Sequence, residues 1–111
     1  MADCIFCKIA AGDIPAARVY EDEHCIAFRD LYPKAPVHVL LIPRAHIAGL
    51  DALTSGHDAL MAHMLRCLPQ IARALGLAEG FRTIVNTGRG GGQEVFHLHF
   101  HLLGGDRLPG L

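Results

Sequence analysis

Histidines alternate with large apolar residues in residues 97–103, which read HLHFHLL. Successive side chains of a β-strand point to opposite faces, so His97, His99 and His101 are predicted to share one face of a strand. The leucines and phenylalanine between them would share the other face and be buried. Histidines can also fill the wet face of a strand without any further role. Three in register nevertheless favour a row of neutral nucleophiles, proton donors or metal ligands.

The chain is long enough for one compact domain, expected over residues 1–111. Its hydrophobic content of 51% argues against general disorder. The net charge is −1 and no basic stripe is visible, so a nucleic-acid partner is not expected. The apolar stretch 37–43 contains a histidine and is too short to span a bilayer. No signal-peptide pattern is present, so we expect a cytoplasmic protein without a membrane partner.

The four cysteines fall into two kinds. In a reducing cytosol they are not expected to form structural disulfides. Cys25 and Cys67 lie in apolar patterns and are predicted to be small core residues. Cys4 and Cys7 have a C-x-x-C spacing that fits metal ligation or redox chemistry. No strand precedes this pair, which favours a metal site, provided that two more ligands are found.

The hydrophobic periodicity predicts an α+β domain, an antiparallel sheet with helices on one face. The expected helices cover residues 4–10 and 57–75, and the expected strands 17–20, 24–30, 37–42, 81–86 and 95–103. Asp3 is expected to cap the first helix. Ser55 and Asp58 resemble a capping box for the second. Pro69 should kink or split that helix, because it removes a backbone hydrogen bond near Leu65.

A glycine-rich loop, residues 87–93, comes directly before the histidine segment. Glycines allow backbone N–H groups to converge on a phosphate, although such a loop can also be an ordinary flexible hairpin. A neutral imidazole can attack phosphorus and form a phosphorylated or nucleotidylated histidine, while its neighbours orient it and move protons. Asn86 and Gln93 could donate to the phosphate or to the leaving group, or merely cap the loop.

The HLHFHLL segment resembles the signature of the histidine-triad nucleotide-binding family. The likeness extends through IFCKI, GDIP, AFRD, PVHVLLIPRAHI, GGQEVF and LLGG, which together cover nearly the whole chain. The last of these runs is similar to the branch of purine nucleoside phosphoramidate hydrolases. The resemblance implies a five-stranded antiparallel sheet with one long and one short helix. It also implies a homodimer whose two sheets join, which would cover an open sheet edge.

The resemblance also assigns roles to single residues. It implies that His99 is the nucleophile, that His101 contacts phosphate and assists proton transfer, and that His97 and His38 complete a relay. Asp30 would accept hydrogen bonds from the ribose hydroxyls. The implied purine pocket consists of Phe6, Ile14, Phe28 and Leu31, and the implied phosphate site of Asn86, Gly92, Gln93, Glu94 and Val95.

Some bacterial relatives in this family bind zinc through a C-x-x-C pair and two histidines. The matching positions here are Cys4, Cys7, His46 and His97. Two thiolates and two imidazoles suit a closed, tetrahedral structural Zn²⁺ site. The remaining histidines, His24, His57 and His63, are expected on the surface or on a helix, with no partner that the pattern identifies.

The leading functional prediction is hydrolysis of the P–N bond in adenosine or guanosine 5′-phosphoramidates, which releases the purine nucleotide and an amine. Hydrolysis of dinucleoside polyphosphates, nucleotidyl transfer to another acceptor, and a zinc- and nucleotide-binding regulatory role are the alternatives. Glu94 departs from the family pattern, in which many relatives carry serine. The chain also lacks the C-terminal tryptophan of eukaryotic relatives, so preference for a leaving group cannot be carried over.

Overall fold

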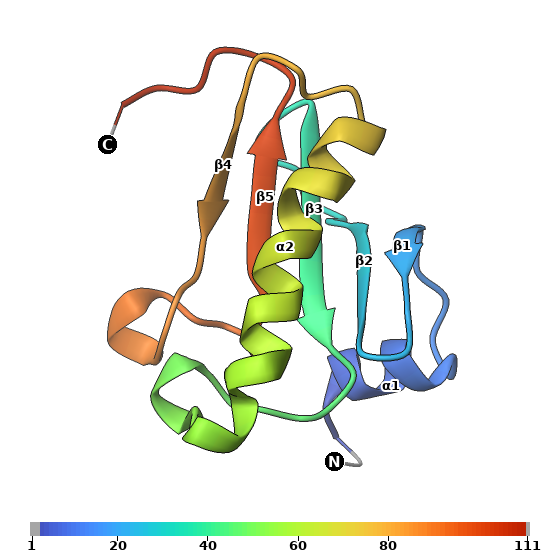
Figure 1. Ribbon diagram of the computed structural model, residues 1–111, viewed down its shortest axis with the longest axis vertical. Helices are drawn as coiled ribbons and strands as arrows, with labels where there is room; N and C mark the ends of the chain where they lie inside the picture. Colours follow the sequence, from blue (N-terminus) through green and yellow to red (C-terminus); the bar gives the residue numbers. More distant parts are fainter. Residues whose placement is uncertain (1–2, 111) are drawn as a thin grey trace.

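The computed structural model describes residues 3–110 and contains a five-stranded antiparallel sheet (Figure 1). Its strands are β1 (Arg18–Glu21), β2 (Cys25–Arg29), β3 (Val37–Pro43), β4 (Phe81–Ile84) and β5 (Phe100–Gly104). They lie in the order β1-β2-β3-β5-β4, and every neighbouring pair is antiparallel. The predicted α+β class and the five-stranded antiparallel sheet are confirmed.

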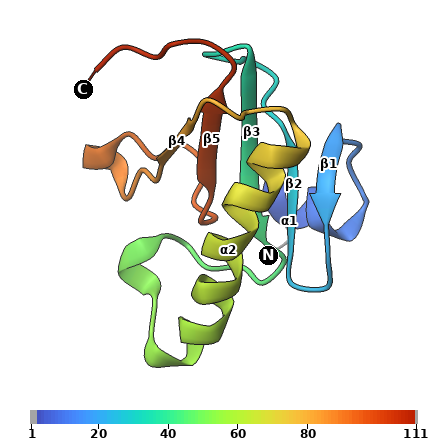
Figure 2. The same cartoon turned by 45° about the horizontal axis from the view of Figure 1, so that its top comes forward.

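The two α-helices, α1 (Ile5–Ala11) and α2 (Asp58–Ala74), cover opposite faces of this sheet (Figure 2). On β2 and β3, Cys25, Ala27, Val39 and Leu41 pack on the α2 side, and Ile26, Phe28, Leu40 and Ile42 pack on the α1 side. The prediction that both helices lie on one face is therefore wrong. Apolar residues of β2 and β3 point to both faces of the sheet, so each face must be covered by a helix.

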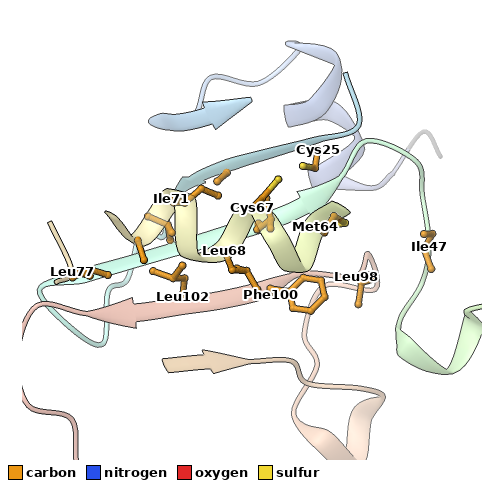
Figure 3. Close-up of a cluster of buried hydrophobic side chains, with 14 residues drawn as sticks. Cys25, Ile47, Met64, Cys67, Leu68, Ile71, Leu77, Leu98, Phe100 and Leu102 are labelled. Atoms are coloured by element: carbon orange, nitrogen blue, oxygen red, sulfur yellow. The ribbon is translucent and has the colours of Figure 1, made fainter. Parts of the chain in front are cut away.

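The apolar face of α2 forms the larger core. Met64, Cys67, Leu68 and Ile71 follow one another at helical spacing and pack on the sheet (Figure 3). The helix continues through Pro69, so the expected split does not occur. Proline removes the bond to the carbonyl four residues earlier, at Leu65, whose side chain is 55% exposed. Water can satisfy a carbonyl on that side of the helix. Within the described residues, no helix is long and apolar enough to cross a membrane.

Both helices begin differently from the prediction. In α1 the N-cap is Cys4 and not Asp3, and the Cys4 Sγ accepts a hydrogen bond from the Cys7 N–H at 3.4 Å. A 3₁₀ turn (Ser55–His57) precedes α2, and its capping box joins Thr54 and His57 in place of Ser55 and Asp58. The Thr54 N–H donates to Nδ1 of His57 at 3.0 Å. An imidazole nitrogen thus takes the place of the usual carboxylate oxygen.

The histidine segment is only partly a strand. β5 begins at Phe100, so His101 lies within the sheet and His97 and His99 precede it. The partner strand β3 ends at Pro43, which has no N–H with which to extend the ladder. The Leu98 N–H donates instead to the Ile47 carbonyl at 2.6 Å. The predicted strand over 95–103 is therefore too long at its start, although Leu98, Phe100 and Leu102 are buried in the α2 core as expected.

The two leucines at positions 65 and 68 of α2 give a direct test of this core. We expect Leu68→Ala to lower the free energy of unfolding by about 2–5 kcal/mol, because Leu68 is 4% exposed and its loss leaves a cavity. Leu65→Ala removes the same atoms at a position that is 55% exposed, so it should change the free energy of unfolding by about 0.5 kcal/mol or less. Urea unfolding measures both. Equal losses in the two variants would contradict the described packing of α2.

Candidate active site

A cleft of about 640 Å³ opens on the α1 side of the sheet. Residues that the sequence analysis selected as catalytic or nucleotide-binding line it: Phe6, Ile14, Phe28, Asp30, Leu31, His38, Asn86, Gly92, Glu94, Val95, His99 and His101. Residues far apart in the sequence therefore meet in one concave, mostly apolar site with a few polar groups, as is usual for small-molecule sites. A second cavity, of about 700 Å³, contains none of the selected residues.

A chain of hydrogen bonds orients the imidazoles of His38 and His101. The Lys34 N–H donates to Nδ1 of His38 at 3.0 Å, which assigns the His38 proton to Nε2. This Nε2 lies 2.9 Å from Nδ1 of His101 and 3.5 Å from Oδ2 of Asp30. If His38 donates to Nδ1 of His101, the neutral His101 ring carries its own proton on Nε2. Sequence reasoning missed Lys34, whose only signal was its place between Pro33 and Pro36.

His99 has the complementary arrangement. Its Nδ1 lies 2.8 Å from the backbone carbonyl of His97 and can only donate to it, so in the neutral ring Nε2 carries the lone pair. The ring packs edge-on against Phe6 with centroids 5.2 Å apart, and it lies 5.1 Å from the His101 ring. The cleft therefore combines a nitrogen nucleophile or base, His99, with a neighbouring N–H donor, His101.

The surroundings of His38 and His101 keep these two rings neutral. Burial lowers the pKa of His101 to about 4, and the neighbouring His99 and His38 act in the same direction. Burial also lowers the pKa of His38, against the opposing effect of the Asp30 carboxylate. At neutral pH both imidazoles are therefore uncharged in the free protein. Each ring then has one N–H donor and one nitrogen that can accept a hydrogen bond.

The structure separates His97 from the other two triad positions. Its ring is fully buried and does not line the cleft. The Nε2 donates to the Pro43 carbonyl at 2.7 Å, so Nδ1 carries the lone pair. That Nδ1 lies 3.3 Å from the Cys4 Sγ and 3.5 Å from the Cys7 Sγ. Of the two roles predicted for His97, the geometry supports the metal ligand and gives its ring no contact with His38 or His101.

The predicted metal ligands meet at the start of α1. One ligand atom from each of Cys4, Cys7, His46 and His97 lies within 4.8 Å of all the others. The Cys7 Sγ is 3.3 Å from Nδ1 of His46. Burial raises the pKa of the Cys7 thiol, and the neighbouring Cys4 raises it further. A bound divalent cation would reverse this effect and favour the thiolates, so this donor set fits a tetrahedral zinc ion.

Three amides of the glycine-rich loop are engaged within the loop itself, so they are not available as donors to a phosphate. The N–H groups of Gly91 and Gln93 both donate to the Gly88 carbonyl, and that of Gly92 donates to Arg89. Gly88 and Gly92 have φ of 71° and 84°, which favour glycine because it lacks a Cβ. These amides are therefore used up in closing the loop. Glu94 follows and lines the cleft.

The side chain of Gln93 is also fully engaged away from the cleft. Its Oε1 accepts from the Gly88 N–H at 2.8 Å, and its Nε2 donates to the Ala48 carbonyl at 2.7 Å and the Val95 carbonyl at 3.0 Å. Gln93 thus holds the loop in place and is not among the cleft-lining residues. By contrast, the amides of Glu94 and Val95 find no acceptor within residues 3–110.

A further group of polar side chains lies on the α2 side, where no site was predicted. His63, for which the sequence indicated no partner, places its Nε2 2.7 Å from Oδ2 of Asp22. Cys25 and Cys67 are buried as predicted, but both sulfurs lie beside this pair. The available signal was the i, i+4 spacing of His63 and Cys67, which puts both on one side of a helix.

Comparison with known proteins agrees with this geometry. Residues 11–108 match the HIT domain family. The chain is 53% identical to protein HitA of Neisseria gonorrhoeae over 94% of its own length and 97% of that protein. It also resembles the crystal structure of a HIT family hydrolase from Legionella pneumophila, with a TM-score of 0.94 and 46% identity over 96% of each chain. For a histidine triad protein from Clostridium difficile the TM-score is 0.96, with 45% identity over 100% of this chain and 97% of that one.

The lowered pKa values of His101 and His38 predict how stability depends on pH. Unfolded imidazoles take up protons below about pH 6.5, whereas the folded His101 resists protonation down to a pKa of about 4. The free energy of unfolding should therefore fall as the pH is lowered from about 6.5 to about 4.

Urea unfolding at several pH values, with a chelator present to exclude metal loss, measures this slope. Replacing His101 by Gln removes the titrating group and should reduce the slope. The exposed His24 gives the matched control, His24→Gln. An unchanged slope in His101→Gln would contradict the assigned environment of this ring.

Proposed function

The chain belongs to the HIT domain family, and on this basis we propose that it hydrolyses the P–N bond of purine nucleoside 5′-phosphoramidates. The products are a nucleoside monophosphate and an amine. One observation carries this proposal: the unprotonated Nε2 of His99 belongs to a cleft-lining ring beside His101. A neutral imidazole with its second nitrogen held by a carbonyl is a suitable nucleophile for phosphorus.

In the proposed first step, Nε2 of His99 forms a bond to the α-phosphorus. The P–N bond breaks, its electron pair stays on the leaving nitrogen, and that nitrogen takes a proton from His101. The Nε2–H of His38 donates to Nδ1 of His101 and stabilises that ring after it has given up its own Nε2 proton. The His97 carbonyl, which accepts from Nδ1 of His99, stabilises the positive charge on the nucleotidylated ring.

In the second step, water attacks the phosphorus of the intermediate. Its proton passes to His101, the oxygen bonds to phosphorus, and the bond to His99 breaks, which restores both imidazoles. His38 and Asp30 act behind His101, since His38 lies 2.9 Å from it and 3.5 Å from the Asp30 carboxylate. We therefore assign His38 as a positioning residue for the His101 ring.

The cleft lining supports a purine nucleotide as the bound molecule. Phe6, Ile14, Phe28 and Leu31 provide an apolar wall for the base. The Asp30 carboxylate accepts one backbone hydrogen bond, from the Tyr32 N–H at 2.8 Å, and retains acceptor capacity for the ribose hydroxyls. The free amides of Glu94 and Val95, together with the Asn86 side chain, are the proposed phosphate donors.

Substitution of the nucleophile tests this proposal. We expect His99→Ala to lower kcat for an adenosine phosphoramidate by at least about a thousandfold, because no other side chain can form the covalent intermediate. AMP affinity should change by less than about tenfold, because the base and ribose contacts remain. Mass spectrometry of wild-type protein quenched at alkaline pH should show one nucleotidyl group on His99.

Two controls make the result interpretable. The first is His24→Ala, at an exposed histidine outside the cleft, which should hydrolyse the phosphoramidate at the wild-type rate. Dinucleoside polyphosphates, assayed beside the phosphoramidate, test the nearest alternative substrate class. Turnover by His99→Ala at the wild-type rate, or an adduct mapped to another residue, would refute the assignment of His99.

We further propose that Cys4, Cys7, His46 and His97 hold a structural zinc ion. Their four ligand atoms converge, and the Pro43 contact turns the free Nδ1 of His97 toward the two sulfurs. When bound, zinc would tie the start of α1 to the segment after β3 and would take no part in the P–N chemistry. Four protein ligands leave no open position, which is typical of structural sites.

Zinc analysis of the purified protein tests this proposal. Cys7→Ser should contain about one zinc equivalent per chain less than wild type, because the site loses a thiolate ligand. The matched control is His24→Gln, which leaves this donor set intact. Equal zinc contents in wild type and Cys7→Ser would contradict the proposed site.

We also propose that the protein forms a homodimer through an edge of its sheet. β1 and β4 are the outer strands, so each exposes one row of backbone N–H and C=O groups. Pairing of one such edge with its copy would extend the sheet across the dimer. Phe81, at the start of β4, is 40% exposed and would become buried if the dimer forms through the β4 edge.

A further inference from the structure

Four side chains with metal-binding chemistry converge at the boundary between the β1–β2 turn and α2. They are Asp22, Cys25, His63 and Cys67, here called the Asp22 group, and one ligand atom of each lies within 4.8 Å of the others. Cys25 and Cys67 belong to the α2 core, so this group lies on the opposite face of the sheet from the cleft. We propose that the Asp22 group is a second metal site, which takes a zinc-type divalent cation.

The spacing of the ligand atoms is close to that of a tetrahedral site. With metal–ligand bonds of about 2.0–2.3 Å, neighbouring ligand atoms lie roughly 3.3–3.8 Å apart. The Cys67 Sγ is 3.6 Å from Nε2 of His63, and the Cys25 Sγ is 3.7 Å from Oδ2 of Asp22. The Cys67 Sγ is 4.0 Å from the same Oδ2. The His63–Asp22 pair, at 2.7 Å, must open to admit the ion, and the Tyr20 hydroxyl, which donates to the same Oδ2, must make room for it.

Local structure already fixes the carboxylate for this role. Oδ1 of Asp22 accepts from the His24 N–H at 2.7 Å and from the Cys25 N–H at 2.9 Å, which closes the turn between β1 and β2. Oδ2 therefore points toward α2. There, His63 and Cys67 lie one helical turn apart and face it together. Little rearrangement is needed to bring all four ligands to one ion.

The two sulfurs have polar neighbours, which core packing alone does not explain. The Cys67 Sγ lies 3.5 Å from the Tyr20 hydroxyl and beside His63. The Cys25 Sγ lies 3.5 Å from Oδ1 of Asp22. Figure 3 shows the two cysteines facing each other between β2 and α2. A pair of thiolates with one imidazole and one carboxylate is a set that zinc prefers over calcium or magnesium.

Charge also favours a cation here. Burial alone would raise the pKa of Asp22, but hydrogen bonds from Tyr20, from two backbone amides and from His63 outweigh it and lower the pKa. The Asp22 carboxylate is thus ionised at neutral pH beside the Cys25 thiol. Burial, and the nearby Cys67 and Asp22, raise the pKa of Cys25 far above its usual range. A divalent cation would neutralise this anionic site and release the thiol protons on binding.

The group has a route to solvent. The side chain of His63 is 38% exposed and that of Asp22 is 23% exposed, so an ion can enter between them without unfolding the core. Once bound, it would join the β1–β2 turn to the middle of α2. Four protein ligands again leave no open position, so the site is structural and independent of the proposed P–N hydrolysis.

Metal titration of the full chain tests this inference. In the Cys4→Ser/Cys7→Ser variant, which disables the first metal group, Co²⁺ should still bind at about one equivalent with a thiolate-to-cobalt absorption band. Adding His63→Gln should weaken this binding by at least about tenfold, because glutamine can keep the hydrogen bond to Asp22 but is a poor ligand. Adding His24→Gln should leave binding unchanged, although the His24 ring packs against His63.

A second set of variants guards against loss of folding. If the Cys4→Ser/Cys7→Ser chain does not fold, zinc is counted in the wild type and in single variants. His63→Gln and Cys67→Ala should then each lose about one of two equivalents per chain. Circular dichroism checks that the variants remain folded. No thiolate–cobalt band beyond the first site, equal metal contents in all variants, or a Cys25–Cys67 disulfide under reducing conditions would overturn the proposal.

Discussion

The pairing of β5 with β3 is the constraint on which the site depends. This register sets Leu40 opposite His101 and His38 opposite Leu103. Side chains alternate between faces, so a slip of one residue would move His101 into the α2 core and break its contact with His38. Both strands are buried on both faces, which makes such a slip costly. The same pairing therefore fixes the core and the cleft.

Backbone groups decide what each imidazole can do. The Lys34 backbone N–H donates to the His38 ring, whereas the His97 backbone carbonyl accepts from the His99 ring. One ring is thereby assigned as a donor toward His101, and the other retains a lone pair toward the cleft. Because both contacts come from the main chain, side-chain substitution at those positions would leave the assignment of protons in place. This arrangement needs neither a carboxylate nor a metal beside His99.

The sheet separates two groups of sulfur and imidazole ligands. The first, which includes Cys7 and His97, lies at the start of α1, and the second, around Asp22, lies against α2. Each brings together segments that are distant in sequence. A metal at either place would act on stability and leave the cleft to the chemistry. His99 and His101 line the cleft, whereas His97 and His63 belong to these two groups.

The sequence by itself determined the sheet and the burial on the α2 side, because strand and helix periods are local. Most of the residues that line the cleft followed from the resemblance to the histidine-triad family and not from these periods. The sequence did not determine where the histidine strand begins, since that depends on where β3 stops at Pro43. Nor could it show that the His97 ring donates to the Pro43 carbonyl, 54 positions earlier. It also could not show that the Gln93 side chain bonds to Gly88 and Ala48. It was also silent on His63 and Asp22, 41 positions apart. Only tertiary structure decided these roles, because each depends on which distant group supplies the hydrogen-bond partner.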